Sequence, residues 1–156
     1  MPPRVLFVCL GNICRSPMAE AVFSHLAQEA GFECEVDSAG TGSWHVGDPA
    51  DPRTLATLRT HGVPYHGRGR QVRREDFLEF DYLVAMDQAN QRDLLRMAPP
   101  GTESKVSLLL EWDSQAPRID VPDPYYGGPE GFDEVYQLVD SASRALLTAL
   151  RREAAK

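Results

Sequence analysis

The residues RVLFVC, at positions 4–9, form an almost uninterrupted apolar run near the start of the chain. A strand of this composition is buried on both faces, which is typical of the centre of a parallel sheet. Three more short apolar runs follow, at 32–39, 82–86 and 105–109, and helical patterns alternate with them at 17–30, 51–61, 88–97 and 132–152. Such alternation favours right-handed crossovers and helices on the faces of the sheet. The sequence therefore predicts a single α/β domain over residues 1–156, in three layers, with a central, mostly four-stranded parallel sheet flanked by helices.

The composition limits the classes of partner and the cellular compartment that we expect for this protein. The net charge of −7 argues against a nucleic-acid partner, and no stretch has the roughly 20 apolar residues of a membrane span. The N-terminal residues lead directly into a strand pattern, without the features of a signal peptide. Cys9, Cys14 and Cys34 cannot all pair within one chain and suit a reducing compartment. We therefore expect a cytoplasmic protein with no membrane partner, in which Cys34 is a buried core thiol.

The loop LGNICRS, at 10–16, connects the first strand to the first helix. Ligands of a parallel sheet bind beyond the carboxyl ends of its strands, and a loop there directs backbone N–H groups and a helix N-terminus toward an anion. Arg15 offers a planar fork for two phosphate oxygens, Gly11 permits a close approach of the backbone, and Asn12 tolerates left-handed dihedrals. The loop predicts a phosphate-binding site formed by Leu10, Gly11, Asn12, Ile13, Cys14, Arg15 and Ser16.

Cys9 ends the first strand and lies beside this loop. A thiol near a helix N-terminus and Arg15 is expected to be ionised, with Ser16 placed to donate a hydrogen bond to it. A thiolate beneath a bound phosphate is a nucleophile that forms a phosphocysteine intermediate. The alternative is that Cys9 is a core cysteine and Arg15 a surface cation. The strand before the loop and the helix after it favour the functional interpretation.

The segment DPYY, at 123–126, lies in one of two long irregular stretches, 40–50 and 114–131, which both contain aromatic residues. Asp123 stands between two prolines and is suited to protonate a leaving phenolate and then to activate water. Tyr125, Tyr126 and Trp44 would form an aromatic slot for a phosphotyrosine ring. Taken alone, DPYY is also compatible with a simple turn.

The run CLGNICRSPMAEAVF resembles the active-site loop of the low-molecular-weight protein tyrosine phosphatases, which use no cofactor. The resemblance continues through DSAGT (37–41), DPR (51–53), DFLEFDYLVAMD (76–87) and DPYYG (123–127), and so covers nearly the whole chain. It implies a phosphotyrosine phosphatase I-like fold of flavodoxin-like topology. It also implies roles for residues at matching positions: Cys9 as nucleophile, Arg15 as phosphate clamp, Asp123 as general acid, Asn12, Ser16 and Ser38 as loop support, and Leu10, Trp44 and Tyr125 as pocket wall.

The chain departs from this family at one position. Many members carry a histidine three residues before the arginine of an Arg-Gln pair, which here is Arg70 and Gln71. That position is Gly67, and no role is transferred to the neighbouring His66. The basic run 68–74 is expected to border the pocket or to solvate a turn.

The remaining titratable residues give weaker signals. Cys14 is expected to form a disulfide with an exposed, low-pKa Cys9 under peroxide, although it could simply pack under the loop. His25 and His61 are expected to be structural, whereas His45 could touch the substrate. No His, Cys and carboxylate cluster has metal-ligand spacing, so we expect no metal site.

Three rival functions remain open. A thiol-linked arsenate reductase needs further relay cysteines, and only Cys34 is left over. A phosphoarginine phosphatase has threonine before the second loop cysteine, where this chain has the apolar Ile13. A non-catalytic phosphotyrosine-binding module has no need of Asp123. We therefore expect a monomeric enzyme that acts on phosphotyrosine-containing proteins and releases inorganic phosphate, which is also its inhibitor.

Overall fold

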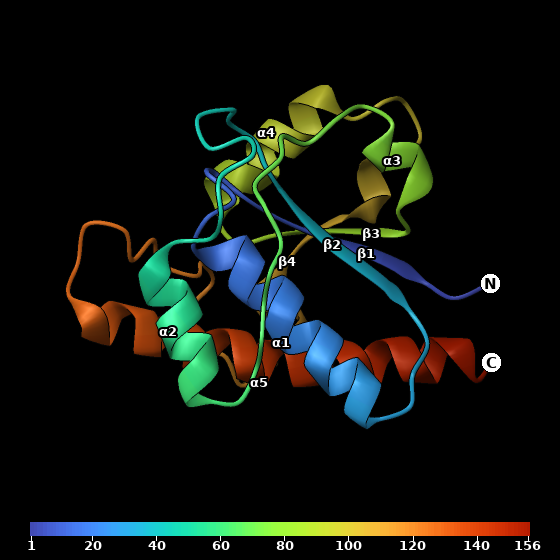
Figure 1. Cartoon of the computed structure of the whole chain (residues 1–156). Helices are drawn as coiled ribbons and strands as arrows, with labels where there is room; N and C mark the ends of the chain where they lie inside the picture. The colour runs from blue at the N-terminus through green and yellow to red at the C-terminus, as the bar shows by residue number, and fades with distance from the viewer.

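The computed structural model describes all residues, 1–156, and its centre is a parallel four-stranded sheet (Figure 1). The sheet order is β2-β1-β3-β4. The strands are β1 (Arg4–Cys9), β2 (Glu35–Gly40), β3 (Tyr82–Ala85) and β4 (Val106–Leu108). The α-helices are α1 (Arg15–Glu29), α2 (Pro52–Thr60), α3 (Asp76–Glu79), α4 (Gln88–Met97) and α5 (Pro129–Ala154), and the 3₁₀ helices are η1 (Glu103–Lys105) and η2 (Leu109–Trp112).

Helices cover both faces of the sheet and make three layers. Figure 1 shows α1, α2 and α5 on one side and α3 and α4 on the other. Alternate residues of β1 enter two separate cores: Val5 and Phe7 join the larger cluster with α1 and α5, whereas Leu6 and Val8 join the smaller cluster with α3 and α4. Burial of both faces explains why the sequence of this strand is apolar throughout. The predicted three-layer α/β fold is confirmed.

The ends of α2 have the residues that helix termini favour. Asp51 accepts a hydrogen bond from the backbone N–H of Arg53 and caps the first turn, where Pro52 needs no partner. Gly62, just past the end, has a φ of 74°. By contrast, the N-cap residue of α1 is Cys14, which makes no side-chain cap, so the first turn of this helix keeps its N–H groups for another acceptor.

The structure corrects several predicted boundaries. Strand β2 begins at Glu35, three residues later than predicted, so Cys34 precedes it. Cys34 is half-buried at the margin of the larger core, and the prediction of a fully buried thiol is wrong. Its partial burial still raises the pKa of the thiol. The short helices α3, η1 and η2 were not predicted, and α5 begins three residues earlier, at Pro129.

Two histidines occupy structural positions, as expected. The ring of His61 stacks on that of Tyr136, with centroids 3.7 Å apart, and Nε2 of His25 lies 3.5 Å from a carboxylate oxygen of Glu29 in the same helix. None of the helices combines the length and the apolar character needed to cross a bilayer.

Candidate active site

The loop between β1 and α1 is fixed to the neighbouring segments through its backbone. The carbonyls of Cys9, Leu10 and Ile13 accept hydrogen bonds from the N–H groups of Thr41, Gly42 and Asp51, respectively, at 2.8–2.9 Å. A Cβ added at Gly40 would lie 2.8 Å from the Leu10 carbonyl oxygen, so glycine is required where β2 ends beside the loop. The residues directly after β2 and the N-cap of α2 thus hold the loop in its shape.

The Sγ atom of Cys9 has two polar neighbours. It lies 3.0 Å from Ser16 Oγ and 3.3 Å from the backbone nitrogen of Asn12, which donates to it. Asn12 has a φ of 57°, a left-handed conformation that asparagine tolerates better than most residues. This turn directs the Asn12 N–H back toward the sulfur. The sulfur is therefore held between the Ser16 hydroxyl and the Asn12 amide at the start of the loop.

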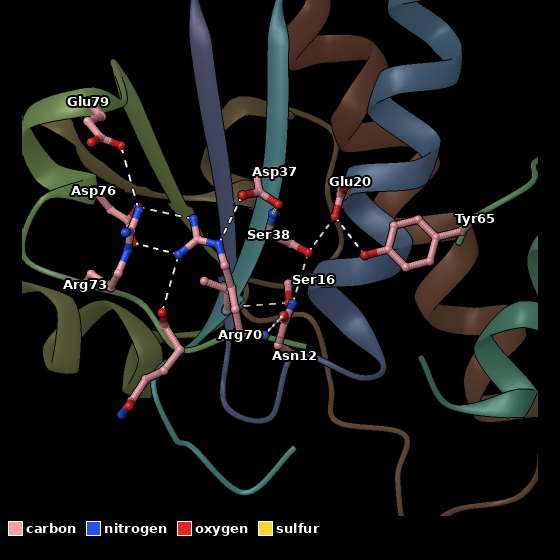
Figure 2. Close-up of polar contacts among 12 residues, drawn as sticks. Asn12, Ser16, Glu20, Asp37, Ser38, Tyr65, Arg70, Arg73, Asp76 and Glu79 are labelled. Atoms are coloured by element: carbon pink, nitrogen blue, oxygen red, sulfur yellow. Dashed lines mark hydrogen bonds and ion pairs between the residues drawn. The ribbon is translucent and has the colours of Figure 1, made fainter. Parts of the chain in front are cut away.

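The side chains of Asn12, Ser16 and Ser38 meet beneath the loop (Figure 2). Asn12 Nδ2 donates to Ser16 Oγ at 2.8 Å and to Ser38 Oγ at 3.0 Å. Asn12 Oδ1 accepts from the backbone N–H of Arg70 at 3.0 Å. Asn12 therefore connects the other two side chains that were expected to support the loop. Neither Asn12 nor Ser16 is among the residues that line the cavity, and their expected role in phosphate binding stays a prediction.

Arg15 is buried at the start of α1, and its guanidinium is held by groups from other segments. Its Nη1 donates to Oδ2 of Asp87 at 2.6 Å and to the carbonyl of Val121 at 3.0 Å, and Nη2 lies 3.8 Å from Oδ2 of Asp123. Burial alone would lower the pKa of Arg15. The interactions of the guanidinium with Cys9 and Asp87 outweigh this effect, so the pKa of Arg15 is raised. Arg15 is thus a fixed cation.

Asp87 was not identified as a site residue from the sequence. It lies two residues after the end of β3, and its Oδ1 accepts from the N–H of Asn90 to cap α4. A carboxylate at the end of a central strand faces the ligand-binding edge of the sheet. In the sequence, only this position after a strand indicated a role at the site. An aspartate before a helix is also expected as an N-cap, so the position alone did not identify it.

Asp123 lies on the long loop that precedes α5. Its Oδ1 accepts from the N–H of Tyr125 at 3.1 Å, and Oδ2 faces Arg15. The side chain is 45% exposed, which leaves the carboxylate open to a molecule in the cavity. The structure thus brings Asp123 to the same site as Cys9 and Arg15.

A cavity of about 410 Å³ opens over the loop. Trp44 and Tyr126 are highly exposed at 72% and 95%, whereas Leu10 and Tyr125 are less so. The Tyr125 and Tyr126 rings meet edge to face, with centroids 4.9 Å apart. His45, expected as a possible substrate contact, also lines the cavity. The full lining is Cys9, Leu10, Gly11, Ile13, Cys14, Arg15, Trp44, His45, Asp123, Tyr125 and Tyr126.

The two loop cysteines are less accessible than expected. Cys9 is 3% exposed and Cys14 is 5% exposed, so the expectation of an exposed Cys9 is wrong: the cavity is its route to solvent. Burial, reinforced by Asp51, Cys9 and Asp123, raises the pKa of Cys14 to about 12. Cys14 is therefore a protonated thiol at neutral pH.

The basic run 68–74 has an unexpected role at Arg70. Its guanidinium forms ion pairs with Asp37 and with the fully buried Asp76, each at 3.0 Å, and does not line the cavity. Arg73 approaches the same Asp76 at 3.6 Å (Figure 2). The prediction that this run borders the pocket or solvates a turn is wrong for Arg70, which braces the segment whose N–H binds Asn12. No group of three or more metal-ligating side chains is found.

Comparisons with known proteins agree with this geometry. Residues 4–156 match the family model described as low molecular weight phosphotyrosine protein phosphatase. A Schizosaccharomyces pombe protein of that name is 49% identical over 147 residues, covering 92% of this chain and 94% of its own.

Solved structures give the same result. A protein tyrosine phosphatase from Entamoeba histolytica has a TM-score of 0.94 at 38% identity, covering 97% of this chain and 99% of its own. A Drosophila arginine phosphatase has a TM-score of 0.89 at 36% identity, covering 94% and 96%. The chain therefore belongs to the low molecular weight phosphotyrosine protein phosphatase family.

Proposed function

We propose that this protein tyrosine phosphatase acts through a phosphocysteine intermediate on Cys9. The observation that supports this most directly is the convergence of Cys9, Arg15 and Asp123 on one cavity. The loop amides and Arg15 bind the non-bridging oxygens of a phosphate. The three groups supply the nucleophile, the anion clamp and the acid that hydrolysis of a phosphate monoester requires.

In the first step, the Cys9 thiolate attacks phosphorus and an S–P bond forms. The bond between phosphorus and the phenolic oxygen breaks as Asp123 donates its proton to that oxygen. Arg15 stabilises the charge on the equatorial oxygens during transfer, because the guanidinium is already oriented by Asp87. The products of this step are the free tyrosine side chain and phosphocysteine.

In the second step, the ionised Asp123 accepts a proton from a water molecule, which attacks phosphorus as the S–P bond breaks. Cys9 leaves as the thiolate, stabilised by Ser16 and by the N–H of Asn12. Inorganic phosphate remains on the loop until it dissociates. It therefore acts as a competitive inhibitor.

The aromatic rim supports a phosphotyrosine substrate. Trp44, Tyr125 and Tyr126 stand beside the cavity and can contact a phenyl ring. A phosphoserine side chain has neither the length nor the ring to use these contacts. Phosphoarginine is the second candidate, because one similar solved structure is an arginine phosphatase. Against it, the apolar Ile13 lines the cavity and suits an aromatic ester.

Three further properties belong to this proposal. Cys9 forms a reversible disulfide with Cys14 under peroxide, supported by the presence of both residues in the cavity lining. The three free cysteines suit a reducing compartment, consistent with a cytoplasmic protein. We also propose that the enzyme acts as a monomer, since Cys9, Arg15 and Asp123 of a single chain suffice for the proposed steps.

The test compares phosphotyrosine, phosphoserine and phosphoarginine peptides as substrates for the wild type, Cys9→Ser and Asp123→Ala. We expect hydrolysis of the phosphotyrosine peptide alone, and only by proteins that retain Cys9. Faster release of phosphate from the phosphoarginine peptide than from the phosphotyrosine peptide would favour a phosphoarginine phosphatase over a phosphotyrosine phosphatase. Full activity in Cys9→Ser would exclude the mechanism.

A further inference from the structure

Helix α2 packs against α5, whose start follows the loop that carries Asp123 (Figure 1). Arg53, in the first turn of α2, reaches this junction with its guanidinium. Its Cζ lies 5.5 Å from the centroid of the Tyr125 ring, in the loop, and 4.6 Å from the centroid of the Phe132 ring, in α5. Within these distances a guanidinium is attracted to an aromatic ring. One cation therefore contacts the acid-bearing loop and the helix that follows it.

Asp51 fixes the guanidinium of Arg53 in this place. Oδ1 of Asp51 accepts from Nε of Arg53 at 3.0 Å, and Oδ2 accepts from Nη2 at 2.9 Å. This bidentate geometry orients the plane of the guanidinium as well as binding its charge. Burial raises the pKa of Asp51, but the hydrogen bonds from Arg53 outweigh burial and the pKa is lowered. Asp51 is thus an ionised and nearly buried partner, with a side chain that is 7% exposed.

The start of α2 is also joined to the loop that follows Cys9. The backbone N–H of Asp51 donates to the carbonyl of Ile13 at 2.8 Å. The hydroxyl of Thr54, in the same helix, donates to the carbonyl of Cys14 at 3.3 Å. The place of Arg53 is therefore set by the loop that binds phosphate in the proposed mechanism. Arg53 thus connects the loop of the nucleophile to the loop of the acid.

On the N-terminal side of Asp123, the acid-bearing loop is held by its backbone. Two residues before Asp123, the N–H of Val121 donates to the carbonyl of Met86 at 2.9 Å. The carbonyl of Val121 accepts from Nη1 of Arg15 at 3.0 Å. This side of the loop is therefore fixed to the segment after β3 and to the proposed phosphate clamp.

On the C-terminal side, Tyr125 orients Asp123 directly. The backbone N–H of Tyr125 donates to Oδ1 of Asp123 at 3.1 Å. The ring of Tyr125 meets that of Tyr126, but Tyr126 is 95% exposed and is a poor support. Arg53, which is held by its ion pair with Asp51, gives the same ring a fixed contact. The contact with Arg53 therefore holds this side of the loop.

We propose that Arg53 is a positioning residue for proton transfer, because it holds the Tyr125 ring and so keeps the carboxyl of Asp123 at the cavity. Arg53 does not line the cavity and touches no substrate. Its effect passes through Tyr125 to Asp123. A small displacement of a reacting group is enough to slow a reaction strongly. The inference rests on the proposed role of Asp123 as the general acid.

The effect of such positioning depends on the leaving group. An acid contributes most when the leaving oxygen is strongly basic, as in phenyl phosphate, and less for p-nitrophenyl phosphate. A displaced Asp123 should therefore slow the first ester more than the second. A loss of packing or of phosphate binding should slow both equally, because the two esters share the phosphate and the phenyl ring. The ratio of kcat/KM for phenyl phosphate to kcat/KM for p-nitrophenyl phosphate separates the two cases.

The test uses Arg53→Met, with Arg59→Met as the matched control. Methionine keeps an unbranched side chain but removes the guanidinium that contacts the two rings. Arg59 is an exposed arginine in the last turn of the same helix. The ratio is measured for the wild type, for both variants, for Asp123→Ala and for the double variant Arg53→Met/Asp123→Ala. Thermal unfolding of each protein shows whether it is folded.

In Arg53→Met we expect kcat/KM to fall about tenfold for phenyl phosphate and less than about threefold for p-nitrophenyl phosphate, as for a lost cation–π contact that orients a reacting group. Arg53→Lys should give a smaller fall of the ratio, since lysine keeps the charge but lacks the planar fork. In the double variant the ratio should equal that of Asp123→Ala alone, because the two residues act as one unit. Arg59→Met should match the wild type for both esters.

An unchanged ratio in folded Arg53→Met would overturn the proposal, even if both rates fell, because that fall would reflect packing alone. A ratio in the double variant that lies below that of Asp123→Ala would overturn it as well. Should Arg53→Met fail to fold, Tyr125→Leu takes its place, since it removes the ring and keeps the backbone N–H. A lowered ratio in that variant would support the proposal, and an unchanged one would overturn it.

The same measurements distinguish this inference from the proposed function. If Asp123→Ala leaves the ratio unchanged, Asp123 is not the general acid, and both the proposed function and the inference fail. If the ratio falls in Asp123→Ala but not in Arg53→Met, the inference alone fails.

Discussion

Replacement of Asp87 separates two roles of one carboxylate. Its Oδ2 accepts from Arg15 Nη1 at 2.6 Å, and its Oδ1 accepts from the N–H of Asn90 at 2.8 Å to cap α4. Asp87→Asn retains an oxygen for the cap, because asparagine and aspartate cap helices equally well, but it removes the charge beside Arg15. Asp87→Ala removes both interactions. The two variants therefore measure the ion pair and the cap separately.

The magnitude follows from the burial of the pair. Removing the partner of a fully buried ion costs about 3–5 kcal/mol. Arg15 is 4% exposed but Asp87 is 21% exposed, and Asp123 remains 3.8 Å from the guanidinium. We therefore expect a loss of about 2 kcal/mol in the free energy of unfolding for Asp87→Asn. Loss of the cap adds about 1 kcal/mol in Asp87→Ala, for a total of about 3 kcal/mol.

Urea unfolding in phosphate-free buffer measures these differences, with thermal unfolding in parallel. For a domain of this size, a loss of about 1 kcal/mol in the free energy of unfolding lowers Tm by about 2–4 °C. We therefore expect Tm to fall by about 4–8 °C in Asp87→Asn and by about 6–12 °C in Asp87→Ala. Asp93→Asn is the matched control, since Asp93 forms an exposed pair with Arg96 on the same helix and should change stability by less than about 0.5 kcal/mol. If both Asp87 variants were as stable as this control, the assignment of Asp87 as the anchor of Arg15 would be refuted.

Three further predictions concern the catalytic groups. Asp123→Ala should lower kcat for phenyl phosphate by about 10²–10⁴-fold. The effect on p-nitrophenyl phosphate should be smaller, because its leaving group needs less protonation. Equal losses of kcat on both esters would argue against Asp123 as the general acid. The pKa of Cys14 is raised from 9.0 to about 12, so the unfolded chain releases this proton first and stability should fall as pH rises from about 9 to 12. Cys14→Ala should lose less stability between pH 7 and pH 10 in urea unfolding under reducing conditions, and parallel curves would contradict the burial of this thiol. Mild peroxide should inactivate the wild type, and dithiothreitol should restore it more fully than it restores Cys14→Ala; permanent loss in both would exclude the protective disulfide.

The features that the sequence predicted are those determined by local pattern. The apolar run at 4–9 became β1 with the predicted bounds, because burial on both faces removes polar residues from such a strand. The helix at 88–97 was also predicted with its full bounds, since Asp87 caps its start and Pro99 follows its end. The place of the loop between β1 and α1 was also predicted, whereas its role as an anion site stays a prediction.

The features that the sequence did not predict depend on contacts between distant segments. Asp87 and Arg15 are separated by 72 residues, and the Tyr65 hydroxyl and its acceptor Glu20 by 45 (Figure 2). Carboxylates and tyrosines are common surface residues, so nothing in their own neighbourhood indicates such partners. The single-turn helix α3 likewise depends on the ion pairs of its buried Asp76. A helix this short has little stability of its own, and its pattern is too brief to be detected.

The central claim is that Cys9 carries the phosphoryl group during the reaction, and trapping of that intermediate tests it most directly. Asp123→Ala is mixed with p-nitrophenyl phosphate and quenched in acid, since the second step also needs Asp123 and the intermediate should accumulate. We predict that mass spectrometry finds one phosphoryl group on Sγ of Cys9, and none in the Cys9→Ser protein treated in the same way. Release of phosphate at the wild-type rate without any adduct on Cys9 would contradict the account.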